Sequence, residues 1–250
     1  IRGGWGKAGN ASGIPAYAYY SLERLNKVGG SWSPYQTGSD VTWEVTTDTN
    51  IGVDLGFVNN RIKLTADFYK RKTDDLIMPI PIGLGIPDYS QNVGSMENKG
   101  MEFTLNTVNF KTTDFSWNTN FNISFNKSKV LELKYVPIID AAGIPSAGNL
   151  VRFAANQPIS SFYGYKYDGV DVNTGEIIYK DLDGNGMLSA GDRTFIGNPN
   201  PDYTFGFTNN FAYKNWYMDV LVTGSQGGDI YNASRFELEM MDDHKNQSTI

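Results

Sequence analysis

The sequence predicts an all-β fold, and more specifically a portion of a large antiparallel transmembrane β-barrel with long extracellular loops. The first observation is a period of two: from Trp43 to Phe57 the odd positions are apolar or threonine, and the even positions are polar or glycine. Successive side chains of a strand point to opposite faces, so this segment has one apolar and one polar face. The second is that very short connections alternate with long ones. The third is composition, because charged residues make up only 19% of the chain and aromatic residues 14%, where about a quarter charged is usual.

About seven spanning strands are expected, because the same alternation returns along the chain. The segment Ile1–Lys7 is interpreted as the end of an outgoing strand, which keeps short and long connections in alternation. On the other six strands the apolar face carries no charged residue. The expected strands are Ile1–Lys7, Trp43–Phe57, Ile62–Tyr69, Met101–Asn106, Phe115–Asn126, Tyr203–Tyr213 and Trp216–Thr223.

The lengths of the connections predict which end of the barrel is periplasmic and which is extracellular. Short turns are expected around Asn59-Asn60, Lys111–Asp114 and Lys214-Asn215. Bacterial barrels have short periplasmic turns and longer extracellular loops. The apolar run Leu76–Pro87 carries three prolines and two glycines, so it is predicted as loop. The long outer loops are then expected at 10–41, 74–98, 127–201 and 226–250.

Two environments suit strands with one apolar face: the core of a soluble β-sandwich or barrel, and a lipid bilayer around a watery lumen. Soluble strands usually have about 5–6 residues, whereas a tilted membrane strand needs about 9–11. The polar faces consist mainly of Asn, Ser, Thr and Gly, as suits a lumen. Aromatic residues lie next to the short turns, where a barrel places its interfacial girdle: Phe57, Phe110, Phe115, Tyr213 and Trp216.

Composition and charge exclude several functions. The net charge is -6, which argues against a nucleic-acid partner. The chain has no cysteine and a single histidine, His244, so neither a thiolate zinc site nor a histidine-based triad is expected. The paired carboxylates Asp74-Asp75 and Asp242-Asp243 are interpreted as solvated loop charges, and we expect no enzymatic activity. The chain starts without methionine or a signal peptide, so it is expected to be a segment of something longer.

One loop has the pattern of a calcium site. From Asp181 to Asp192, oxygen-bearing side chains stand at positions 1, 3, 5 and 12 and glycine at position 6, as in an EF-hand loop, with Asp in place of the usual Glu at position 12. The expected ligands are Asp181, Asp183, Asn185, the Met187 carbonyl and Asp192. The alternative is an Asx-rich turn without an ion. A bound calcium would be structural.

Three aromatic residues on the expected outer loops could stack on sugar rings. They are Trp32, Tyr35 and Tyr89. They could equally hold the loops together, so they are weak candidates for substrate contact.

Several segments together resemble the SusC/RagA-like TonB-dependent outer-membrane transporters. The segment Asn92–Phe103 is similar to the family's Asn-x-Gly-x-x-x-Asn-x-Gly-x-Glu signature. The strand Trp43–Asp54 resembles the family's Trp-Glu…Asn-Ile-Gly-x-Asp strand. The other matching segments are 67–77, 115–118, 162–165, 181–186, 197–201 and 224–232.

The resemblance implies a function that the strand pattern alone does not. Such transporters form a barrel of about 22 strands with an N-terminal plug, in the outer membrane of Gram-negative bacteria. They import oligosaccharides or peptides with energy delivered by the TonB complex, and a SusD-like surface lipoprotein covers the barrel. By this resemblance the chain is expected to lack the plug and the TonB-contacting part, and the substrate stays open. The alternatives are a secreted soluble calcium-dependent glycan-binding β-domain and a passive porin or adhesin barrel.

Overall fold

The fold is dominated by one sheet of long strands. The computed structural model describes residues 1–14, 23–28, 31–36, 41–80, 89–134, 138–141 and 149–239. The large sheet has seven strands in the order β1-β4-β5-β6-β7-β14-β15, and every neighbouring pair is antiparallel. These strands are β1 Arg2–Asn10, β4 Glu44–Phe57, β5 Ile62–Ile80, β6 Tyr89–Lys111, β7 Phe115–Leu133, β14 Tyr203–Tyr213 and β15 Trp216–Gln226.

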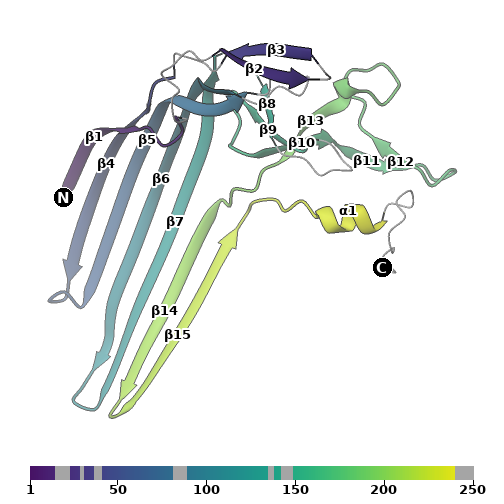
Figure 1. The fold of residues 1–250 in the computed structure, drawn as a ribbon. Coiled ribbons are helices and arrows are strands. Elements are labelled where there is room, and N and C mark those ends of the chain that lie inside the picture. The colour runs from purple at the N-terminus through teal and green to yellow at the C-terminus, as the bar shows by residue number, and fades with distance from the viewer. Residues whose placement is uncertain are drawn as a thin grey trace.

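The sheet is a curved wall with all its short turns at one end (Figure 1). The hairpins β4–β5, β6–β7 and β14–β15 close at the predicted positions, and Val58, Asn59 and Asn60 adopt positive φ in the first of them. All seven predicted strands are present. The prediction of an all-β barrel portion is confirmed.

The predicted outer loop 74–98 is largely strand, so its expected bounds were wrong. β5 continues to Ile80 and β6 begins at Tyr89, and the two stay paired through this region, with a bulge between Thr73 and Leu76. The apolar run expected as loop from Leu76 to Pro87 is therefore strand as far as Ile80. Its apolar side chains have a place to pack: Leu76 and Met78 contact the fully buried Val93. This small cluster accounts for apolar residues that the alternation rule did not explain.

The two glycines of the segment Asn92–Phe103 have a structural explanation in β6. A side chain at Gly94 would collide with the carbonyl oxygen of Glu132 on β7. One at Gly100 would come within 2.5 Å of both the Phe125 carbonyl oxygen and the Tyr69 hydroxyl. Glycine lets the strands approach at both points.

Smaller sheets lie at the end of the wall opposite the short turns (Figure 1). The segment 127–201, predicted as a loop, contains regular structure: β7 extends to Leu133, and six short strands follow it. These are β8 Ile138–Ala141, β9 Val151–Ala154, β10 Ser161–Tyr165, β11 Tyr167–Val170, β12 Ile177–Tyr179 and β13 Arg193–Gly197. They form a sheet in the order β13-β10-β9-β8 and the pair β11-β12.

The predicted loops 10–41 and 226–250 also hold regular elements. A hairpin of β2 Glu23–Val28 and β3 Ser31–Gln36 lies in the first, and the helix α1 Ala233–Glu239 in the second. Among the described residues no helix is long and apolar enough to span a membrane.

The two faces of the large sheet differ as the sequence predicts. One row across six strands is entirely apolar: Leu55, Leu64, Leu105, Phe121, Phe207 and Val222. Many large side chains of this face are exposed, Ile51 and Phe68 among them, whereas only three hydrophobic residues of the described chain are buried. A soluble sandwich would bury this face against a second sheet. Here the apolar face is left for lipid.

Candidate functional site

The polar face of the wall carries an ion-pair network centred on Arg2. The guanidinium of Arg2 bonds to the Asp54 carboxylate and donates to both carboxylate oxygens of Asp67, at 2.7 and 2.6 Å. Thr65 donates its hydroxyl to the other oxygen of Asp54 at 2.9 Å. Arg2 lies opposite Gly52, whose missing side chain leaves room for the guanidinium. Three strands, β1, β4 and β5, thus contribute to one polar cluster.

Next to this cluster, the wall is hollowed into a groove of about 570 Å³. A second ion pair lies in it, between Arg71 Nη2 and Asp48 Oδ2 at 2.9 Å. The Tyr69 hydroxyl donates to Asn126 Oδ1 at 3.1 Å across β6. The groove is lined by Arg2, Asp48, Asn50, Asp67, Phe68, Tyr69, Arg71, Asn98, Glu102 and Asn126.

Farther along the same face the side chains are mainly neutral amides and hydroxyls. Asn120 donates to Asn106 at 2.6 Å, and Asn210 donates to Asp219 at 2.6 Å. Amides both donate and accept hydrogen bonds. Such a surface can exchange hydrogen bonds with polar molecules.

Arg2 was not among the sequence candidates. The aspartates at 48, 54 and 67 could be assigned to the polar face from the alternation of their own strands. The partner of Asp54 and Asp67 depends on how β1 pairs with β4, 52 and 65 residues away in sequence. An arginine at the start of a glycine-rich strand was the only sequence signal.

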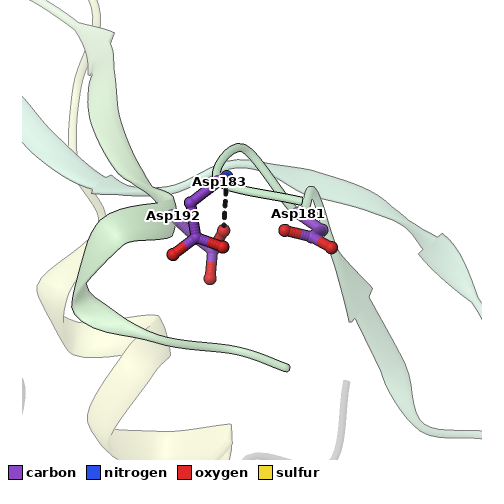
Figure 2. Close-up of side chains that lie close together, drawn as sticks. All are labelled: Asp181, Asp183 and Asp192. Carbon is purple, nitrogen blue, oxygen red and sulfur yellow. Dashed lines mark hydrogen bonds between the residues drawn. The ribbon is translucent and has the colours of Figure 1, made fainter. Parts of the chain in front are cut away.

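The predicted calcium loop lies between β12 and β13 and brings its carboxylates together. Figure 2 shows Asp181, Asp183 and Asp192 around a common space. One ligand oxygen from each lies within 4.8 Å of the others. Oxygens on opposite sides of a calcium ion are about 4.6–5.2 Å apart, twice the usual Ca–O distance. The spacing of the three carboxylates therefore suits such an ion.

Backbone groups hold these carboxylates in place. Asp192 is 0% exposed, and it accepts from the N–H groups of Ser189 at 2.7 Å and Leu182 at 2.7 Å. These hydrogen bonds lower the pKa of the Asp192 carboxyl below its ordinary value, so it is charged at neutral pH. Asp181 accepts from the N–H groups of Gly184 and Gly186, which both have positive φ.

The two other predicted calcium ligands, Asn185 and the Met187 carbonyl, are not part of the carboxylate cluster. Asn185 donates its amide to Asp183 Oδ2 at 2.9 Å and accepts the Met187 N–H at 2.7 Å. Ligation by Asn185 and by the Met187 carbonyl stays a prediction. No flanking pair of helices is present in this part of the chain. The loop ends in the short 3-10 helix Ala190–Asp192, which Ser189 caps.

The aromatic candidates for sugar contact are placed only by their backbone. Trp32 and Tyr35 lie in β3, and Tyr89 is the first residue of β6. Their side chains, and all of His244, lie outside the described residues, so their role in substrate contact stays a prediction.

Together, a curved antiparallel wall with an apolar and a polar face, short turns at one end and elaborated loops at the other defines part of a large transmembrane β-barrel. The model of the family "TonB dependent receptor-like, beta-barrel" matches residues 1–236. The chain belongs to this family.

Relatives and solved structures agree with this assignment. TonB-dependent receptor P3 of Formosa agariphila is 35% identical over 95% of this chain and 26% of its own length. TonB-dependent receptor SusC of Bacteroides thetaiotaomicron is 31% identical over 92% of this chain and 25% of its length. A structure of the RagAB peptide transporter aligns with a TM-score of 0.78 and 26% identity, over 95% of this chain and 28% of that one. The chain thus spans about a quarter of the length of these relatives.

Proposed function

We propose that the chain forms part of the barrel wall of a SusC-like importer that carries oligosaccharides or peptides across the outer membrane of a Gram-negative bacterium. The observation that carries the proposal is the polar face of the large sheet. It runs from the groove at Arg2 and Asp67 to the amides Asn120 and Asn210 near the short turns. A polar face opposite an uncovered apolar face suits the boundary between a lumen and lipid.

The substrate class is supported by the chemistry of this face. Oligosaccharides offer hydroxyl groups and peptides offer amides, and both can exchange hydrogen bonds with Asn, Ser and Thr side chains. RagAB, the structural neighbour, is a peptide transporter, whereas SusC is named a TonB-dependent receptor. No residue of the groove favours one class over the other, so the proposal covers both. We assign the chain no catalytic step.

The partners follow from the same assignment. We propose that the outer end of the wall, with β8 to β13, meets a SusD-like lipoprotein that covers the barrel. Transport would be driven through the TonB complex.

The proposed location can be tested on the native source. An antibody against the segment 127–201 is expected to detect the protein in the outer-membrane fraction, in a band that shifts on a gel when the sample is boiled. Closed barrels resist detergent until heated, which gives the shift. A soluble protein without a shift would contradict the proposal and favour a secreted calcium-dependent glycan-binding domain.

The cargo can be tested by growth. Deletion of the gene is expected to abolish growth on some members of a panel of oligosaccharides and peptides as sole nutrients, and to leave growth on glucose unchanged. Deletion of the gene for the proposed SusD-like lipoprotein should give the same pattern. Uptake that persists after removal of TonB would instead indicate a passive porin.

We propose that the Asp181–Asp192 loop binds a structural calcium ion, as its spacing suggests. Calcium titrated into the purified transporter is expected to bind one site in calorimetry, and Asp183→Asn is expected to weaken this binding at least tenfold because it removes a carboxylate ligand. Asp168→Asn, an exposed aspartate outside the loop, is the matched control. Equal calcium binding by both variants would leave the loop an Asx-rich turn.

A further inference from the structure

Two rows of lysine side chains cross the outside of the wall, on the same face as the apolar residues. In the first row, Lys70 of β5 lies opposite Lys99 of β6 in the strand register, and Lys99 lies opposite Lys127 of β7. The second row lies two residues farther from the short turns. It contains Lys7, Lys72, Glu97 and Lys129. We refer to these two sets as the lysine rows.

The boundary between the apolar face and the lysine rows is sharp. The row of residues immediately below Lys70, Lys99 and Lys127 is Ile51, Phe68, Met101 and Phe125. Two residues along a strand span about 6.8 Å, so the charges begin within one side-chain length of the apolar surface. Trp5 lies in the first lysine row, opposite Thr49. Tryptophan is enriched where a membrane protein meets the headgroup layer.

The positive charge of the rows is only partly balanced. The rows contain six lysines and one glutamate, and the carboxylates of Asp74 and Glu132 lie near Lys72, although the chain as a whole has a net charge of -6. Glu97 lies 2.9 Å from the ammonium of Lys70 and 4.0 Å from that of Lys99, and Asp74 pairs with Lys72 at 2.8 Å. Within the described part of the chain, Lys7 and Lys127 have no ion-pair partner.

Like charges directly opposite one another on adjacent strands are destabilising. Neighbouring strands are about 4.8 Å apart, so Lys70, Lys99 and Lys127 hold three ammonium groups within a short arc. Their side chains are nonetheless exposed, 62% for Lys70 and 63% for Lys99. An arrangement of this kind is explained if anions from outside the protein neutralise it.

We propose that the lysine rows bind the phosphate groups of glycolipids in the outer leaflet of the membrane. The rows lie toward the end opposite the short turns, which in bacterial barrels is the outer end. Lysine has a long apolar stem and a charged tip, so it can cover lipid chains while its ammonium reaches a headgroup phosphate. The inference rests on the proposed outer-membrane location.

A protein partner fits this surface less well than lipid. The rows share a face with Phe68 and Met101 and adjoin them directly, so a protein docked on the lysines would have to lie within the headgroup layer. Lipid phosphates are already at that depth. The charge complementarity therefore favours lipid.

The test uses the intact transporter purified in detergent. The row variant combines Lys70→Gln, Lys99→Gln and Lys127→Gln. The control variant combines Lys63→Gln, Lys111→Gln and Lys166→Gln, which removes the same charge from exposed lysines outside the rows. Each protein is titrated with a doubly phosphorylated lipid A and with the same lipid stripped of phosphate, and bound lipids are counted by native mass spectrometry. A heat-shift gel shows that each barrel is folded.

Wild type and control are expected to retain phosphorylated lipid, and the row variant to bind it at least about tenfold more weakly, because basic residues add to the affinity for anionic lipid. Equal binding by all three proteins, or equal binding of the stripped lipid, would overturn the inference. So would loss of a co-purifying protein from the row variant with unchanged lipid binding. If wild type is missing from the outer membrane, the proposed function itself fails, which membrane fractionation shows separately.

Discussion

Arginine in place of Leu105 is expected to destabilise the barrel by about 2–4 kcal/mol, the cost of placing this side chain at the lipid-facing middle of a barrel. Leu105 stands in the uniformly apolar row, between Leu64 on β5 and Phe121 on β7. Toward the outer end the next row is apolar, with Ala66, Phe103 and Ile123, so an arginine cannot easily extend to the outer headgroup layer. Toward the short turns the next row includes Thr107 and Thr119. Its charge would have to be solvated by a local defect of the bilayer.

The matched control is the neighbouring residue on the same strand. Thr104 points to the opposite face, where it lies between Thr65 and Asn122. Thr104→Arg is expected to change the free energy of unfolding by less than about 1 kcal/mol, since a lumen-facing arginine stays in water. Urea unfolding of the intact barrel in lipid vesicles measures both variants. Equal losses at 104 and 105 would mean that the two faces see the same solvent, and the assignment of lipid and lumen would be wrong.

Six of the seven strands were predictable because two different environments impose a period of two on each of them, and the first was expected from the alternation of short and long connections. The predicted strands were too short where the two faces of the sheet no longer differ in polarity. Above the level of Lys70 and Lys99, polar side chains stand on both faces, so alternation no longer marks a strand. Backbone pairing nevertheless continues through β5 and β6 and carries both strands into the segment expected as loop.

Whether a candidate site could be predicted depends on how far apart its residues lie in the sequence. The carboxylates of Asp181, Asp183 and Asp192 lie close together because the spacing within one tight loop determines their positions, and their role as metal ligands stays a prediction. The Arg2 network and the lysine rows join residues of different strands. They depend on register, which is fixed by the pairing of whole strands and cannot be read from a single segment.

Alanine in place of Asn92 is expected to destabilise the outer end of the wall by about 2–4 kcal/mol, because each buried polar group left without a partner costs about 1–3 kcal/mol. Asn92 is only 9% exposed. Its side-chain oxygen accepts the Thr42 N–H at 2.8 Å, and its amide donates to the carbonyls of Thr42 at 2.8 Å and Asp75 at 2.6 Å. One side chain thus satisfies three backbone groups that belong to no regular pairing.

The Asp75 carbonyl explains why an amide is required here. Asp74 and Asp75 stand opposite the single Ser95 of β6, so β5 has one additional residue in this bulge, and Asp75 adopts a positive φ of 57°. A bulge leaves its residue out of the regular ladder, so its carbonyl needs another donor. Aspartate at position 92 keeps the size of the side chain and its acceptor oxygen but has no amide to donate. Asn92→Asp is therefore expected to be at least as destabilising as Asn92→Ala, because a carboxylate would face two carbonyl oxygens.

Asn98 provides the control within the same strand and the same family signature. It pairs with Arg71 and Ser128, and it is only partly buried. Asn98→Ala is expected to change stability by less than about 1 kcal/mol. Hydrogen exchange of the backbone amides near Thr42 and Asp75, followed by mass spectrometry, should be faster than in wild type for Asn92→Ala. For Asn98→Ala the exchange rate of these amides should be unchanged. Unchanged exchange in Asn92→Ala would mean that the bulge is held by strand pairing alone, and the asparagine of the signature would need another explanation.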